Sequence, residues 1–177
     1  MHKHFINLSI VTFLIVGCTV RSLPVPQSQM TQLSTLLQTL DTHTSQQEST
    51  KLSRDIFQKT AALSTEFKLT SPPLWHNTLV NVGLREKGLC YHWSDALYAH
   101  LVVKDYPSFE FHLVGANIGE YFWEHNALVV VSKRGKVESG VLIDPWRDSG
   151  KLYFAKLKND KKYTWSHRLD RECKPTR

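Results

Sequence analysis

The helix around which we expect the chain to fold opens within the segment Gly88-Leu89-Cys90-Tyr91-His92-Trp93-Ser94-Asp95-Ala96-Leu97. A glycine before the cysteine indicates a turn, and apolar residues then recur at helical spacing, at Leu97, Tyr98, Leu101 and Val102. The pattern predicts a helix from Cys90 to about Val103, whose buried stripe holds the thiol in place. Because the positive end of a helix dipole stabilises a thiolate, the first turn of a helix is a favourable place for a reactive sulfur.

Two polar residues farther along lie in segments with the composition of β-strands. His125 precedes the aliphatic run 127–131, and Asp144 ends the run 141–144. An imidazole can withdraw the proton of a thiol, and a carboxylate can fix the tautomer of that imidazole. The expected strand order places both residues on adjacent antiparallel strands, where they can meet the thiol.

The order of these motifs resembles that of the transglutaminase-like cysteine protease superfamily. The likeness covers roughly residues 75–153 and consists of a Cys that opens a helix, a His followed by β-branched and aliphatic residues, and an Asp followed by Pro. It implies that Cys90 is the nucleophile, His125 the general base and acid, and Asp144 the residue that orients His125. It also implies an α+β, papain-like core, in which the nucleophile helix packs on an antiparallel sheet. The bulky segment Tyr91-His92-Trp93 departs from the small or acidic residue that members commonly place after the Cys.

Attack on a carbonyl also requires donors for the oxyanion and walls for the substrate. The backbone N–H of Cys90 is one donor, and Asn81 or Trp75 is a candidate for the second. Each of the three motif residues has a tryptophan nearby in the sequence: Trp93, Trp123 and Trp146. These are candidates for lining a substrate cleft, and aromatic core packing is the alternative.

Residues 1–17 resemble a bacterial lipoprotein signal peptide. Lys3 supplies a positive charge, residues 5–16 are mostly apolar, and Gly17 before Cys18 resembles a lipobox. The apolar stretch is too short for an ordinary membrane span. The resemblance implies cleavage before Cys18 and a lipid on Cys18. The alternatives are an ordinary signal peptide with an incidental cysteine and an uncleaved anchor.

The residue that follows Cys18 is Thr19 rather than Asp, so retention in the inner membrane is not signalled. The resemblance therefore implies a lipid-anchored protein of the bacterial cell envelope, in the outer membrane and facing the periplasm. Residues 18–29 contain two prolines among polar residues and predict a tether. Residues 30–177 are expected to form a single domain with an N-terminal helical extension, because 177 residues with 41% hydrophobic content suffice for one core.

Lipid on Cys18 leaves two cysteines, Cys90 and Cys173, for the mature domain. A disulfide between them is the alternative to a free catalytic thiol in an oxidising compartment. The charged tail around Cys173 and the apolar surroundings of Cys90 favour the free thiol. A zinc site of Cys90, His92 and His125 lacks paired-ligand spacing such as C-x-x-C, so no metal and no cofactor is expected. Elsewhere, His100 and His112 are expected at the surface or on a strand face.

The remaining apolar periodicity predicts the other elements. We expect amphipathic helices over residues 30–40 and 49–69, a further helix over 75–85, strands over 109–114, 121–131 and 137–144, and edge strands over 151–157 and 163–167. The net charge of +6 comes from basic runs that concentrate late in the chain. Because no nucleic-acid-binding module accompanies them, no nucleic-acid partner is expected.

These features together predict a lipid-anchored thiol enzyme outside the cytoplasm, which attacks an amide carbonyl and forms a thioester at Cys90. The acyl group then passes to water or to an amine, with water expected to compete better in an open site. Candidate substrates are peptide or isopeptide bonds of envelope proteins and the peptide cross-links of peptidoglycan. A non-catalytic envelope binding module on the same fold is the alternative.

Overall fold

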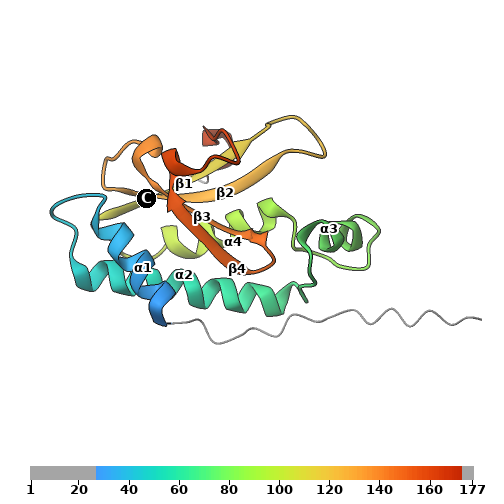
Figure 1. The fold of residues 1–177 in the computed structure, drawn as a ribbon, viewed down its shortest axis with the longest axis horizontal. Helices are drawn as coiled ribbons and strands as arrows, with labels where there is room; N and C mark the ends of the chain where they lie inside the picture. Colours follow the sequence, from blue (N-terminus) through green and yellow to red (C-terminus); the bar gives the residue numbers. More distant parts are fainter. Residues whose placement is uncertain (1–26, 173–177) are drawn as a thin grey trace, which may run out of the picture.

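The computed structural model describes residues 27–172, so the expected signal peptide, Cys18 and Cys173 lie outside the described residues. The fold is α+β, which confirms the predicted class (Figure 1). The helices are α1 (Gln27–Gln38), α2 (Gln46–Glu66), α3 (Pro73–Asn81) and α4 (Cys90–Val102). The strands are β1 (Phe109–Ala116), β2 (His125–Ser132), β3 (Val141–Asp148), β4 (Lys151–Lys156) and β5 (Ser166–His167). They form one antiparallel sheet in the order β4-β3-β2-β1-β5.

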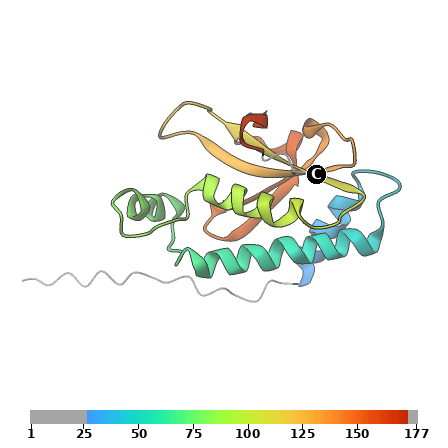
Figure 2. The same ribbon diagram turned by 180° about the vertical axis from the view of Figure 1, so that it is seen from behind.

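Helix α4 lies between the sheet and α2 (Figure 2). Its apolar stripe is fully buried at Trp93, Leu97 and Leu101, as the spacing of these residues predicts. The stripe packs on the side chains of one sheet face, which include Leu128 and Ile143. Full burial of a leucine contributes roughly 1.5–3 kcal/mol, so this stripe fixes the position of the helix that begins with Cys90.

The other face of the sheet carries a second apolar cluster, to which β2 contributes Ala127, Val129 and Val131. Strand β2 is therefore buried on both faces, which explains why its sequence is a continuous aliphatic run rather than an alternating one. The outer helices α1 and α2 pack on each other. Helix α2 covers α4 from outside, whereas α1 contacts β4. None of the helices within residues 27–172 combines the length and apolarity needed to cross a bilayer.

Several predicted boundaries differ from the observed ones. Helix α1 begins at Gln27, so the last three residues of the predicted tether are helical. Strand β2 begins at His125 rather than at residue 121, because the register pairs His125 with Ala116 and leaves residues 117–124 to connect the two strands. Residues 137–139 form a short 3₁₀ helix, and β3 starts at Val141. The predicted strand over 163–167 is reduced to the two residues of β5.

Candidate active site

The turn before α4 is held from three sides. Gly88 has φ +127°, and a Cβ at this position would lie 2.0 Å from Nε2 of His76. Its carbonyl oxygen accepts a hydrogen bond from Nε1 of Trp93 at 3.0 Å. Nδ1 of His92 accepts the N–H groups of Gly88 and Leu89, each at 3.1 Å. The sequence therefore fixes Cys90 as the first residue of α4 through contacts that only glycine at position 88 permits.

His92 caps the start of α4 rather than acting on the sulfur. Burial, together with the charges of Lys87 and Arg171, lowers the pKa of His92. The neutral ring that results keeps Nδ1 available as an acceptor for the first N–H groups of the helix. Because its ring is engaged there, His92 does not form an ion-binding group with Cys90 and His125 within the described part of the chain.

His125 and Asp144 form a buried pair. Nε2 of His125 lies 2.7 Å from Oδ2 of Asp144, and the two residues are 2% and 0% exposed. Their strands are adjacent, as predicted; His125 is the first residue of β2, and Asp144 lies in the middle of β3. The carboxylate sets the ring tautomer by accepting the proton on Nε2, which leaves Nδ1 for another partner.

Cys90 is that partner. It carries a free, buried thiol, and burial lowers the pKa of His125 while the hydrogen bonds and charges of Asp144 and Cys90 outweigh it and raise this pKa to about 9. Since Nε2 is engaged with Asp144, the contact with Cys90 falls to Nδ1. Among the described residues no group meets full hydrogen-bond geometry at buried Nδ1, and Cys90 is the side chain besides Asp144 that raises the pKa of this ring, so the sulfur is the group placed to exchange a proton with Nδ1. The structure thus brings together all three residues of the predicted triad.

An arginine completes the support of Asp144. Nε of Arg147 donates to Oδ2 of Asp144 at 3.0 Å, and its backbone N–H donates to Oδ1 at 3.2 Å. The other end of the guanidinium holds Asp160 in a two-point contact at 3.1 and 2.7 Å. Asp160 also accepts Nε1 of Trp165 at 2.9 Å. Sequence reasoning missed this chain of contacts from Asp144 through Arg147 to Asp160, because Asp160 comes from a polar segment with no periodic signal.

Aromatic rings surround the imidazole. The ring of His125 lies 4.8 Å from that of Trp146, 4.7 Å from Tyr163 and 5.4 Å from Trp165, measured between centroids. Such a wall keeps water away from the His125–Asp144 pair and strengthens its electrostatic interaction. Of the three predicted cleft residues, Trp146 is half-buried here, and Nε1 of its ring donates to Asn77.

The other two tryptophans occupy different environments. Trp93 is fully buried and packs on Phe67 with ring centroids 5.0 Å apart, so it belongs to the core and lines no open cleft. Trp123 is 70% exposed in the loop between β1 and β2, beside the equally exposed Tyr121 and Phe122. Of the three tryptophans predicted to line a cleft, Trp123 and Trp146 therefore have solvent-accessible side chains that a substrate could contact.

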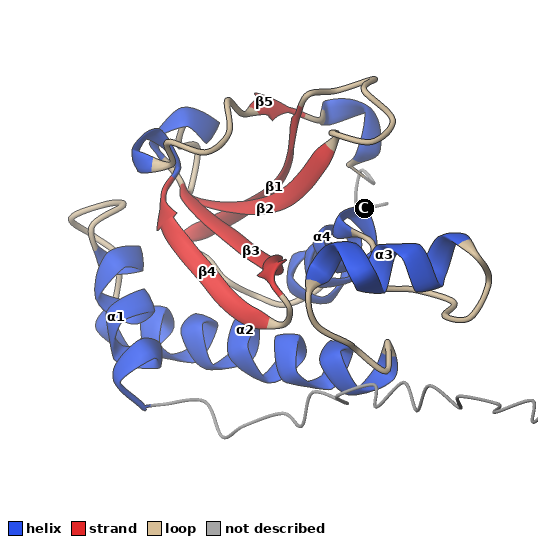
Figure 3. Ribbon diagram, turned by 45° about the vertical axis from the view of Figure 1, so that its right-hand side comes forward, coloured by secondary structure: helices blue, strands red, loops and turns tan. Residues whose placement is uncertain are grey.

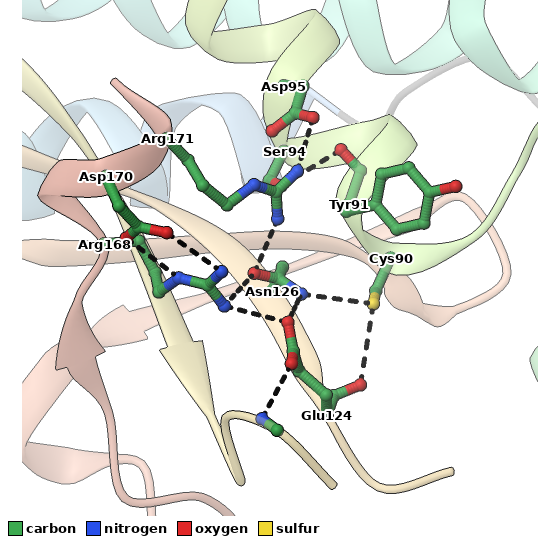
Figure 4. A network of polar contacts seen from close by, with 10 residues as sticks. Cys90, Tyr91, Ser94, Asp95, Glu124, Asn126, Arg168, Asp170 and Arg171 are labelled. Carbon is green, nitrogen blue, oxygen red and sulfur yellow. Dashed lines mark hydrogen bonds and ion pairs between the residues drawn. The ribbon is translucent and has the colours of Figure 1, made fainter. Parts of the chain in front are cut away.

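Asn126 places an amide against the sulfur, and sequence reasoning missed it (Figure 4). Its Nδ2 lies 3.9 Å from Sγ of Cys90, while its Oδ1 accepts Nη1 of Arg171 at 2.8 Å. Because a guanidinium only donates, the amide atom that faces Arg171 must be oxygen, and the atom that faces Cys90 must be nitrogen. The one available signal was the position of Asn126 directly after His125.

Glu124 and Arg168 hold the same amide from its other side. The carboxylate of Glu124 accepts Nδ2 of Asn126 at 3.1 Å and Nη1 of Arg168 at 2.8 Å. The backbone N–H of Gly119 also donates to it, and these bonds lower the pKa of Glu124 to about 2. The carbonyl oxygen of Glu124 accepts Sγ of Cys90 at 3.8 Å. The chain's C-terminal segment thus returns, through Arg168 and Arg171, to the start of α4.

The predicted second oxyanion donors lie elsewhere. Asn81 and Trp75 are on α3 and exposed, Trp75 by 44%. Neither makes a hydrogen bond to Cys90 among the residues that the structure describes. The amide donor that the structure places against the sulfur is that of Asn126.

Comparison of this chain with models of known protein families, with curated proteins and with solved structures finds no match.

Proposed function

We propose that this chain is a thiol enzyme of the transglutaminase-like class, on a papain-like core, which cleaves or transfers acyl groups at amide bonds. The observation that carries the proposal is the position of the His125 ring between Cys90 and Asp144, with its pKa raised to about 9. A ring with this pKa can accept the proton of the thiol as the sulfur attacks, and a protonated imidazole stabilises a thiolate beside it.

In the first half of the reaction, the sulfur of Cys90 attacks the carbonyl carbon of the substrate. The π electron pair of the C=O bond moves to the carbonyl oxygen. The backbone N–H at the start of α4 and the amide of Asn126 donate to this oxyanion. When the oxyanion collapses, the C–N bond breaks and His125 gives its proton to the departing amine. A thioester on Cys90 remains.

In the second half, His125 takes a proton from water as the water oxygen attacks the thioester. The C–S bond then breaks, the proton returns to the sulfur, and a carboxylic acid leaves. An amine that enters in place of water completes acyl transfer instead. We propose hydrolysis as the main outcome, because water is present at higher concentration than any amine unless the site excludes it.

The setting of the reaction is proposed from the sequence alone. A lipid on Cys18 and a position in the bacterial cell envelope would present peptide bonds of envelope proteins or peptidoglycan as substrates. Three exposed aromatic residues, Tyr121, Phe122 and Trp123, directly precede Glu124 in the sequence. The carbonyl oxygen of Glu124 contacts Sγ of Cys90. We propose that these rings bind the substrate chain beside the thiol.

A second candidate function is a non-catalytic binding module of the envelope. It is favoured by the burial of Cys90, which is only 8% exposed. It is also favoured by a cavity of about 520 Å³ between α2 and α4, whose lining includes His92, Asp95 and His100 but not Cys90. In this candidate the triad holds the fold together and the cavity binds the partner.

Alkylation of the thiol separates the two candidates. We expect iodoacetamide to modify Cys90 near neutral pH faster than it modifies free glutathione, as measured by mass spectrometry of the peptide that contains Cys90. His125→Ala should slow this modification at least about tenfold, because the thiolate loses its partner. His100→Ala, on the same helix, is the matched control and should leave the rate unchanged. Equal rates in wild type and His125→Ala would favour the binding module.

A further inference from the structure

Strand β5 pairs with β1 at one edge of the sheet (Figure 3). A second group of polar side chains comes from these two strands and from the segment that follows β5. His112 is on β1, His167 is on β5, and Glu172 follows the short 3₁₀ helix Leu169–Arg171. The register pairs His167 with Val114, two residues from His112 on the same face of β1. None of the three residues takes part in the thiol chemistry, and all three are half-buried.

The ligand atoms of these three residues converge. One nitrogen of each imidazole and one carboxylate oxygen all lie within 4.8 Å of one another. Nε2 of His167 is 2.7 Å from Oε1 of Glu172, and Nδ1 of His112 is 3.3 Å from the same oxygen. The two rings meet edge to face at 4.8 Å. Two imidazoles and a carboxylate from three separate elements therefore face one point.

This geometry fits a small divalent ion. An ion with ligands at about 2.0–2.1 Å in a tetrahedron holds neighbouring ligand atoms roughly 3.3 Å apart. The 3.3 Å between Glu172 and His112 matches that value, and the 2.7 Å between Glu172 and His167 is shorter, so the His167 ring has to move away from the carboxylate to admit the ion. The partial exposure of the group leaves room for water as a fourth ligand.

Glu172 is also held in place from behind. The backbone N–H of Leu113 donates to Oε1 of Glu172 at 2.8 Å. A hydrogen bond of this kind orients a ligating carboxylate, and its loss typically weakens metal affinity. The second oxygen, Oε2, lies 3.3 Å from Nδ1 of His112 and stays on the open side of the group.

We propose that His112, His167 and Glu172 form a binding site for a divalent transition-metal ion of the zinc type. Imidazole nitrogens select zinc and its neighbours over magnesium and calcium, which prefer sites made only of oxygen. The ion ties residues 166–172 to β1. The same segment carries Arg168 and Arg171, which hold Asn126 against Cys90, so the ion stabilises the arrangement of that amide without touching the reacting atoms.

Titration of the full chain with cobalt, followed by competition with zinc, tests the site. Visible absorption bands of Co²⁺ report four- or five-fold coordination, and a near-ultraviolet charge-transfer band would reveal thiolate ligation at a cysteine instead. We expect the wild-type chain to bind one ion with nitrogen and oxygen ligands. His167→Ala and Glu172→Gln should each weaken this binding at least about tenfold, since loss even of outer-shell support costs that much.

The matched control is His43→Ala, which removes an exposed histidine between α1 and α2 and should leave the titration unchanged. The other histidines and the cysteines are common to the wild type, His167→Ala and Glu172→Gln, so the difference between these proteins reports this site alone. Zinc should also slow amide exchange in residues 166–172 of the wild type and of His43→Ala, but not of His167→Ala. Equal cobalt affinity in the wild type, His167→Ala and Glu172→Gln, or no binding by the wild type, would overturn the proposal.

Discussion

At the scale of single residues, the site depends on two neighbours at the start of β2, His125 and Asn126, whose side chains make different contacts. His125 points toward Asp144 and the aromatic rings and also contacts Cys90, while Asn126 points to the other side of the strand and places its amide 3.9 Å from Sγ. The alternation of side chains along a strand explains this division. In the proposed mechanism, one dipeptide at the start of β2 thus supplies both the base and an amide donor.

Asn126→Ala tests the amide. We expect the turnover number for hydrolysis of an activated aryl ester to fall about 10²–10³-fold with little change in KM, because the lost donor acts on the oxyanion and not on the bound ester. Asn81→Ala is the matched control and should keep the wild-type rate, since Asn81 is exposed on α3. A large loss in Asn81→Ala and none in Asn126→Ala would restore the donor expected from the sequence.

Asp144→Asn tests the orientation of His125. The variant should lower the rate of ester hydrolysis by about 10²–10⁴-fold, because an amide at this position favours the wrong ring tautomer. Asp148→Asn changes an exposed carboxylate at the end of the same strand and serves as control. If the two variants hydrolyse the ester at the same rate, Asp144 has no part in the mechanism.

At the scale of elements, the turn into α4 is the most constrained part of the site. Gly88 combines a positive φ with contact to the buried His76, whose ring is fixed by Lys87 and Thr70. A side chain at position 88 would move either His76 or the first residue of α4. Cys90 is therefore positioned by a close contact as well as by the helix.

Gly88→Ala should lower the free energy of unfolding by more than Gly83→Ala does. Both glycines have positive φ, at +127° and +79°, but a Cβ at position 83 meets no atom within 4 Å. Position 83 thus measures backbone strain alone, about 1 kcal/mol, and position 88 adds the clash with His76. Urea denaturation of both variants gives the comparison, and equal losses would show that His76 yields without cost.

At the scale of the whole molecule, the features that can be predicted from the sequence are those that depend on the spacing of apolar residues. The stripe of α4, the doubly buried β2 and the α+β class follow from apolar spacing, and the three motif residues follow from their places on those elements. The start of β2, the chain of contacts from Arg147 to Asp160 and the return of the C-terminal segment do not. The first depends on the register between β1 and β2, and the other two depend on single hydrogen bonds and ion pairs between separate segments, which leave no repeating pattern in the sequence.

The buried pair also makes the stability of the whole fold depend on pH. The pKa of His125 rises from its ordinary value of 6.5 to about 9 in the folded chain. The resulting stabilisation, of the order of 3 kcal/mol, is fully present below pH 6.5 and is lost as the pH rises through about 9. We expect urea denaturation to show this loss in the wild type and a much smaller one in Asp144→Asn. Parallel pH profiles in the two proteins would contradict it.

The most direct test is a nuclear magnetic resonance titration of the His125 ring in the wild type and in Cys90→Ala. The account predicts that the wild-type ring loses its proton near pH 9, with Nε2 protonated throughout, and that the pKa falls when the sulfur is removed. A ring that titrates near its ordinary value in the wild type, or identically in both proteins, would show that Cys90 and His125 share no proton.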